Sequence, residues 1–226
     1  MKLTSLTLLG ALVGSILPTT FAQAGPTLQA KGGDTNVVRA CADELGKRQA
    51  QRRVEVCRNV SPATHPPCNA ANSCALIEDE IARSCALFDG QGAPMEGCLP
   101  APASAQAAAA VVHRYYSALN ARDFSTAWLQ WGENGKPNQP LATFEAGFKH
   151  TRETHVTLGP LPPAEGAAGS IYQTVPVTVD ALLDTGAHQR FTGQYIVRRV
   201  SDVDGASAGQ RRWHLDSARL KAVGVE

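Results

Sequence analysis

All six cysteines fall in one short stretch of the chain and could do one of two kinds of chemistry. They are Cys41, Cys57, Cys68, Cys74, Cys85 and Cys98, and the 128 residues that follow contain none. An even number of thiols predicts disulfides in an oxidising compartment, whereas in the cytosol it would favour a metal or redox site. No two of them form a C-x-x-C pair, the usual unit of a structural zinc site. The spacing therefore favours three disulfides, provided that the chain is exported.

The first 24 residues have the three-part pattern of a signal peptide. Lys2 supplies the positive start, Leu6 to Leu17 is mostly apolar, and Ala22-Gln23-Ala24 places small residues before a cleavage site after Ala24. The apolar run is too short to span a bilayer, and no later stretch lacks charges for long enough to do so. We expect an exported protein, periplasmic or extracellular, with no transmembrane segment.

No histidine pair has the spacing of a known metal site. The sequence contains no H-x-x-x-H or H-x-H pair, so we expect no metal and no cofactor. Its G-x-S-x-G run, Gly205 to Gly209, lies in a predicted polar loop, so we expect no serine nucleophile. His214 and Asp216 are two apart on a predicted strand and would share a face, as a base and its orienting acid could. If Trp213 and Leu215 face the core, the pair lies on the outer face as ordinary surface charge.

Residues 25–99 are predicted to form a small helical module that depends on its disulfides. Residues 36–57 fit one or two amphipathic helices, and residues 72–88 fit another that Asn72 or Ser73 can cap. Antiparallel helices would pair Cys41 with Cys85, Cys57 with Cys74 and Cys68 with Cys98, which is one of fifteen possible pairings. A module of this size buries little core, so bridges worth about 2–4 kcal/mol each would decide whether it folds.

A Pro- and Ala-rich linker at 100–106 is expected to lead into a second domain at 107–226. Apolar spacing predicts a helix from 107 to 119, a short helix capped by Asp123, and a third helix from 141 to 149. The period then changes to two, which predicts strands at 152–158, at 171–183, around Phe191 to Val197, and at 211–221. Pro176 and Gly193 within these strands suggest bends or bulges.

Four segments of this second domain resemble the nuclear-transport-factor-2-like, or ketosteroid-isomerase-like, superfamily over residues 105–223. They are Val112 to Leu119, Asn120 to Trp128, Phe144 to Phe148, and Arg212 to Leu215. The resemblance implies an α+β, cone-shaped domain of three helices packed on a curved antiparallel sheet, with a pocket between them. It also implies a possible homodimer through the sheet face. The superfamily holds both enzymes and non-catalytic binding modules, so function depends on the site.

Isomerase-type catalysis in such a pocket would need a carboxylate base and an oxyanion-stabilising donor. Tyr115 or Tyr116 could supply the donor, and Asp180 or Asp216 the carboxylate. Because adjacent helical residues point about 100° apart, we expect at most one tyrosine to face the pocket, the other covering the helix surface.

Aromatic residues offer a different use of the same domain. Trp128 and Trp131, three apart on a short helix, could form an aromatic wall for a ligand, and Tyr195 faces inward on its predicted strand. Such side chains are alternatively core and rim.

The net charge of the chain limits the classes of partner that we expect. Lys2 is the one charged residue of the signal segment, so the remaining chain has 20 bases and 20 acids. This balance argues against nucleic acid or an anionic membrane surface as the main partner. With no convergent catalytic set, we expect an exported, non-catalytic binding protein whose cone-shaped domain holds a small apolar ligand, or an envelope protein or peptide. The alternative is an isomerase, cyclase or dehydratase that uses a tyrosine and Asp180.

Overall fold

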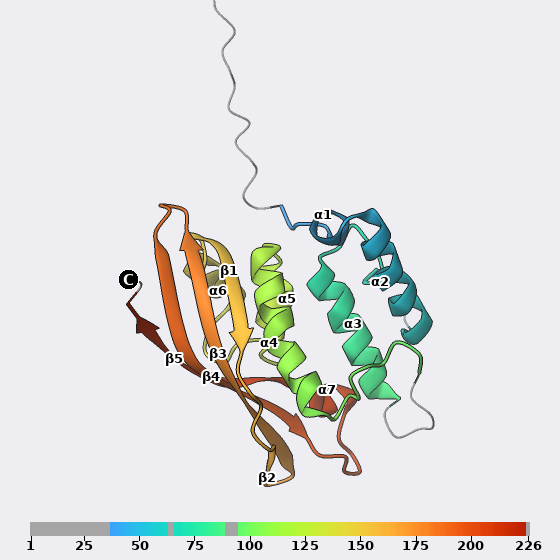
Figure 1. The fold of residues 1–226 in the computed structure, drawn as a ribbon. Helices are drawn as coiled ribbons and strands as arrows, with labels where there is room; N and C mark the ends of the chain where they lie inside the picture. Colours follow the sequence, from blue (N-terminus) through green and yellow to red (C-terminus); the bar gives the residue numbers. More distant parts are fainter. Residues whose placement is uncertain (1–36, 63–65, 89–94, 225–226) are drawn as a thin grey trace, which may run out of the picture. The chain divides into compact units, whose positions relative to one another are not determined.

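The computed structural model describes residues 37–62, 66–88 and 95–224, which belong to one compact unit (Figure 1). This unit is α+β, with three disulfides and a curved antiparallel sheet. The predicted signal peptide and cleavage site lie outside the described residues. Within the described ranges, no helix has the length and apolar composition that crossing a bilayer would need.

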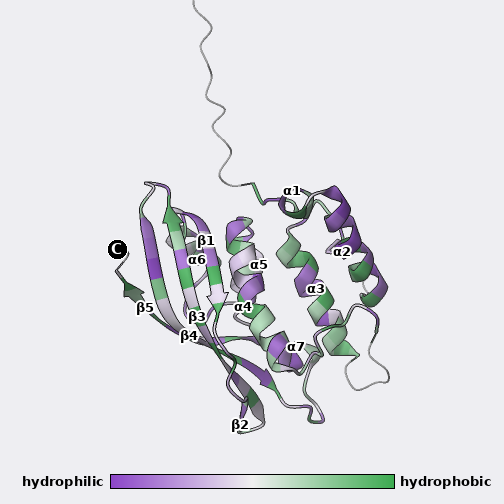
Figure 2. Ribbon diagram, viewed as in Figure 1, coloured by the Kyte–Doolittle hydropathy of each residue, from purple (hydrophilic) through white to green (hydrophobic). Residues whose placement is uncertain are grey.

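The described residues of the cysteine-rich part form three helices: α1 (Cys41–Leu45), α2 (Lys47–Val60) and α3 (Cys74–Leu87). Gly46, at a φ of 78°, turns the chain between α1 and α2, because glycine adopts this left-handed conformation without steric cost. Ser73 caps α3 as predicted, and its hydroxyl accepts a hydrogen bond from the amide of Leu76 at 3.1 Å. Figure 2 shows that α2 is largely hydrophilic; its buried side is Ala50, Val54, Cys57 and Val60.

The three disulfides are present, but the expected pairing is wrong. The bridges join Cys41 to Cys74, Cys57 to Cys68, and Cys85 to Cys98. The expectation treated Cys41 and Cys57 as two positions on one straight helical run facing 72–88. Instead, the turn at Gly46 brings Cys41 to the start of α3, where its amide donates to the carbonyl of Asn72 at 2.6 Å. Three bridges are typical of an oxidising compartment.

The second part of the chain opens with α4 (Ala105–Asn120), α5 (Phe124–Leu129) and α6 (Leu141–Gly147). Ser104 caps α4, so this helix begins inside the segment that was expected to be linker. Asp123 caps α5 as predicted and accepts the amide of Thr126 at 3.0 Å.

One antiparallel sheet follows, in the strand order β1-β3-β4-β5, with β2 also paired to β3. The strands are β1 (Thr151–Leu158), β2 (Glu165–Ala167), β3 (Ser170–Leu183), β4 (His188–Val200) and β5 (His214–Val223). Burial alternates along β3, with Val175, Val177, Val179 and Ala181 inside, as the period-two pattern predicts. Neither β2 nor the short helix α7 (Ala208–Arg211) was expected. The sequence does carry a signal for α7, since Ser207 and Gln210 form a capping box.

The sheet is irregular at two places that the sequence pattern did not indicate. Register shifts leave Arg152 in β1 and Asp216 in β5 without an opposite partner, whereas Pro176 and Gly193 pair in continuous register. Gly193 instead permits a close approach of β5, because a Cβ atom there would lie 1.9 Å from the carbonyl oxygen of Arg219.

The elements form successive layers: the sheet, then α4, then α3, then α2 (Figure 1). One hydrophobic cluster lies between the sheet and α4 to α6, and a second holds the cysteines with Val54, Ile77 and Ile81. Ala75 of α3 belongs to the first cluster, so α3 contributes to both. The capping residues of α3 and α5 also meet, since the Ser73 hydroxyl donates to the Asp123 carboxylate at 2.6 Å.

The bridges differ in the length of chain that they close, which predicts unequal contributions to stability. Cys41 and Cys74 are 33 residues apart, and Cys57 and Cys68 are 11 apart. Loop-closure entropy makes the longer loop worth about 1 kcal/mol more. We expect the double variant Cys41→Ala/Cys74→Ala to lose about that much more unfolding free energy than Cys57→Ala/Cys68→Ala in urea denaturation. Equal losses would contradict this ranking.

The close approach at Gly193 predicts a position that tolerates no side chain. Gly193→Ala should destabilise the protein by about 1–3 kcal/mol, because either β4 or β5 must move to relieve the overlap. Gly166→Ala is the matched control, since nothing lies within 4 Å of a Cβ at this exposed β2 position. Thermal and urea unfolding of both variants would check the prediction.

Candidate functional site

The predicted tyrosine donors are core side chains. Tyr115 and Tyr116 are both buried, so the expectation that at most one would face inward is wrong. The reason is that both rings reach the sheet, although their positions on α4 are about 100° apart: each contacts Tyr195 of β4, with ring centroids 6.1 and 6.2 Å apart. The hydroxyls of Tyr116 and Tyr195 hydrogen-bond each other at 2.8 Å. Burial raises the pKa of Tyr115, Tyr116 and Tyr195 above the ordinary value for tyrosine.

Asp180 does not join these tyrosines. It alternates with the buried valines of β3 and so lies on the opposite face of the sheet, where its carboxylate accepts a hydrogen bond from Arg190 Nε at 2.6 Å. The described residues therefore bring no predicted carboxylate to the tyrosine hydroxyls.

Trp128 and Trp131, which were predicted to form one aromatic wall, lie in different surroundings. Trp131 is buried and packs edge-on against Tyr115 and Tyr195, with ring centroids 6.1 and 6.3 Å apart. Trp128 lies over Gly135, and its indole N–H donates to the carbonyl of Gln139 at 2.8 Å. The structure thus brings Trp131 and Tyr195 together inside the aromatic core, while Trp128 anchors the loop after α5.

Within the described residues, His214 and Asp216 form no hydrogen bond or ion pair, although the Asp216 carboxylate acts to raise the pKa of the His214 ring. The bulge at Asp216 reverses the alternation of β5, so Leu220 comes opposite Gly193 and packs against the core. His214 lies near the carbonyl of Arg212, 3.3 Å from its Nδ1, and burial lowers the pKa of its ring. Within the described residues, no group of three or more His, Cys, Asp or Glu side chains could hold a metal ion.

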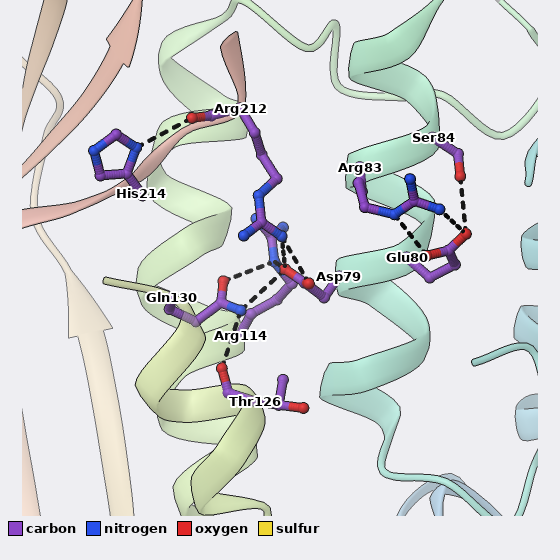
Figure 3. A network of polar contacts seen from close by, with 9 residues as sticks. All are labelled: Asp79, Glu80, Arg83, Ser84, Arg114, Thr126, Gln130, Arg212 and His214. Atoms are coloured by element: carbon purple, nitrogen blue, oxygen red, sulfur yellow. Dashed lines mark hydrogen bonds and ion pairs between the residues drawn. The ribbon is translucent and has the colours of Figure 1, made fainter. Parts of the chain in front are cut away.

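The polar residues that do converge are ones that sequence reasoning did not single out. Figure 3 shows the carboxylate of Asp79, on α3, meeting Arg114 of α4, Gln130 at the end of α5, and Arg212 just before β5. Arg212 Nη1 lies 2.8 and 2.7 Å from the two carboxylate oxygens, and Gln130 Nε2 donates to one of them at 3.0 Å. Arg114 Nε is 3.8 Å away.

This cluster is mostly removed from solvent. The side chains of Arg114, Arg212 and Asp79 are only 10%, 12% and 15% exposed. Burial lowers the pKa of Arg114 from its ordinary value; Asp79 opposes this shift and Arg212 adds to it by like-charge repulsion. Two guanidinium groups thus share a single buried carboxylate.

The neighbouring acid of α3 forms a separate and self-contained cluster (Figure 3). Glu80 accepts hydrogen bonds from Arg83 at 2.9 and 2.6 Å, and from the hydroxyls of Ser84 and Ser61. Burial acts to raise the pKa of Glu80, but these hydrogen bonds outweigh it and the pKa lies below its ordinary value. Glu80 therefore already has the partners that a buried carboxylate needs.

A cleft of about 110 Å³ opens beside Asp79, between α3 and α4. Its α3 wall is Ile81, Ala82, Cys85 and Ala86, and its α4 wall is Ala107, Ala110 and Arg114. Arg212 and Trp213 line it from the start of β5, and Leu99, Pro100 and Pro102 from the chain that leads into α4. The ion pair of Arg53 with Glu78 also borders the cleft. Small apolar side chains and three arginines, of which Arg53 is paired with Glu78, thus line one hollow.

A second hollow lies elsewhere and is more open. It runs along α4 and β1, past His113, Asn120 and Thr154, and includes Arg39 and Glu44. Asn120 is already tied to Thr154, donating to its carbonyl at 2.7 Å and accepting from its amide at 2.8 Å. Arg39 and Glu44 leave this hollow without surplus charge; Tyr116 and His155 also line it.

Comparisons with known proteins add little to this geometry. No family model and no curated protein matches the sequence. Among solved structures, the chain has a likeness to a conserved protein from Planctomyces limnophilus DSM 3776, at 14% identity and a TM-score of 0.37, covering 52% of this chain and 96% of that one. A likeness this weak carries no argument about the site.

Because two arginines share the carboxylate of Asp79, we expect its loss to cost much more unfolding free energy than the loss of the exposed carboxylate of Asp180. Asp79→Asn leaves two mostly buried guanidiniums without their counter-charge and should cost about 3–5 kcal/mol of unfolding free energy. Asp180→Asn is the control, because it breaks an ion pair whose side chains are 36% and 50% exposed and should cost less than about 1 kcal/mol. Urea unfolding at pH 7 measures both. A loss for Asp79→Asn as small as that of the control would contradict the role given to Asp79.

Proposed function

We propose that this is an exported, non-catalytic binding protein that holds a small ligand in the cleft between α3 and α4. The observation that carries the proposal is the composition of the cleft. Two arginines that share one carboxylate line it together with small apolar side chains from α3 and α4. Ligand sites commonly combine mostly apolar walls with a few convergent polar groups.

This proposal moves the ligand from the expected pocket between helices and sheet to a place outside it. Tyr115, Tyr116, Trp131, Phe144 and Tyr195 contact one another in that interior, with ring centroids 5.1 to 6.3 Å apart. Aromatic packing at these distances is what a filled core requires. The disulfide helices then form one wall of the binding site.

We further propose that residues 105–223 have the nuclear-transport-factor-2-like fold. The order of α4, α5 and α6 followed by a curved antiparallel sheet supports this assignment. A homodimer through the outer sheet face remains a prediction. The enzyme alternative has less support, because Asp180 and the tyrosine hydroxyls lie on opposite sides of the sheet.

Blocking the cleft tests the proposal. Ala82 lines the cleft, so Ala82→Trp should fill it. Native mass spectrometry of protein isolated from its own compartment should find a small-molecule adduct on the parent protein and at least a tenfold lower occupancy on Ala82→Trp. Ala146→Trp, at an exposed position on α6, is the matched control and should keep the adduct. The proposal is overturned if the parent carries no adduct, or if Ala82→Trp carries as much as the parent.

A further inference from the structure

The arginines that line the cleft are unequally neutralised. Arg53 is fully paired, because its Nε and Nη2 donate to the two oxygens of Glu78 at 2.5 and 2.7 Å. Arg114 and Arg212 share Asp79 as their ion-pair partner, and Glu78, which is already paired with Arg53, also acts on Arg114. The walls of the cleft therefore carry one positive charge more than the acids beside them, and this surplus is located at Arg114 and Arg212.

These two guanidiniums also have hydrogen-bond donors to spare. A guanidinium has five N–H donors. Arg212 reaches Asp79 through Nη1, and Arg114 contacts Asp79 and Gln130 through Nε. Among the described residues, Nη1 and Nη2 of Arg114 and Nε and Nη2 of Arg212 have no hydrogen-bond partner. Both side chains line the cleft, so an acceptor placed there can meet them.

The rest of the lining restricts what the acceptor can be attached to. Ala82, Ala86, Ala107 and Ala110 offer only methyl groups, and Ile81 and Trp213 add apolar surface. The volume of about 110 Å³ is below the roughly 150 Å³ of an apolar cavity that holds benzene. The enclosed part therefore suits a short aliphatic body, with any longer portion extending past Leu99, which is 84% exposed.

We infer, on the basis of the proposed function, that the ligand of the cleft is a small monocarboxylic acid with a short aliphatic chain. Its carboxylate bridges Arg114 and Arg212 and neutralises the surplus charge, and its chain lies against the alanines of α3 and α4. A planar carboxylate matches the fork of guanidinium donors. A second acid group would meet the carboxylate of Glu78, which also lines the cleft.

The same walls argue against a peptide C-terminus as the source of the carboxylate. A peptide would place an amide N–H and then a carbonyl next to its carboxylate. The alanine methyl groups of the two walls provide no hydrogen-bond partner for them, and the carboxylate of Glu78 is already bound by Arg53. A buried amide without a partner is unfavourable. We therefore assign the site to a free aliphatic acid.

Matched probes test the inference with the mature, oxidised protein. Titration calorimetry should find hexanoate bound at least about tenfold more tightly than hexanamide, which has the same chain and no charge. Hexanoate should also bind at least about tenfold more tightly than N-acetyl-leucine, which carries the peptide-like amide. Equal binding of hexanoate and hexanamide would overturn the acid assignment, and tighter binding of N-acetyl-leucine would overturn the choice of a free acid.

Variants connect this preference to the arginines. Arg114→Gln leaves Asp79 paired with Arg212, so the fold should persist, and the preference for hexanoate over hexanamide should fall below about threefold. Arg190→Gln, on the outer sheet face, should leave the preference unchanged. An unchanged preference in Arg114→Gln, with folding verified by urea denaturation, would overturn the inference.

The test separates this inference from the proposed function. If neither hexanoate nor hexanamide binds while Ala82→Trp still loses the native adduct, the acid assignment fails and the binding function stands. If the parent also carries no adduct, both fail.

Discussion

The carboxylate of Asp79 is the interaction on which the arrangement of this protein depends. It comes from a helix of the cysteine-rich part. It accepts hydrogen bonds from the end of α5 and from the chain entering β5, and it forms an ion pair with Arg114 of α4. Buried ion pairs often contribute little net stability, because desolvation offsets the attraction, yet separating their members is costly. Asp79 thus acts mainly to fix the position of α3 along α4. Sliding α3 along α4 by one turn would leave two guanidiniums and one carboxylate buried apart.

The cleft follows from the same constraint. Asp79 fixes the position of α3 against α4. Further along α3, Ala82 and Ala86 face the cleft, and Ala107 and Ala110 of α4 face it from the other side. Small side chains let two helices pack closely, but here the shared ion cluster and the segment 97–102 occupy the two ends of the contact. A hollow remains between them, with charge at one end and an exposed rim at the other. The larger aromatic side chains lie between the sheet and the helices, where they fill the expected pocket.

Much of the local structure could be predicted from sequence, because its causes are local. The caps at Ser73 and Asp123 and the alternation along β3 needed only neighbouring residues. The disulfide pairing could not be predicted, because it depends on the direction that the chain takes after Gly46. The burial of both Tyr115 and Tyr116 depends on Tyr195, which is 79 residues from Tyr116 along the chain. The ion cluster could not be predicted from the sequence either. Asp79 and Arg212 are 133 residues apart, and nothing in their spacing distinguishes them from surface charges.

The Cys85–Cys98 bridge has a further consequence, since both of its cysteines line the cleft. It links the segment containing Leu99 and Pro100 to α3, so the bridge forms part of the wall of the cleft as well as stabilising the helix. A chain that has not yet been oxidised lacks this fastening and has an incomplete wall. Formation of this bridge therefore also completes the wall of the proposed binding site, and such a bond forms in an oxidising compartment.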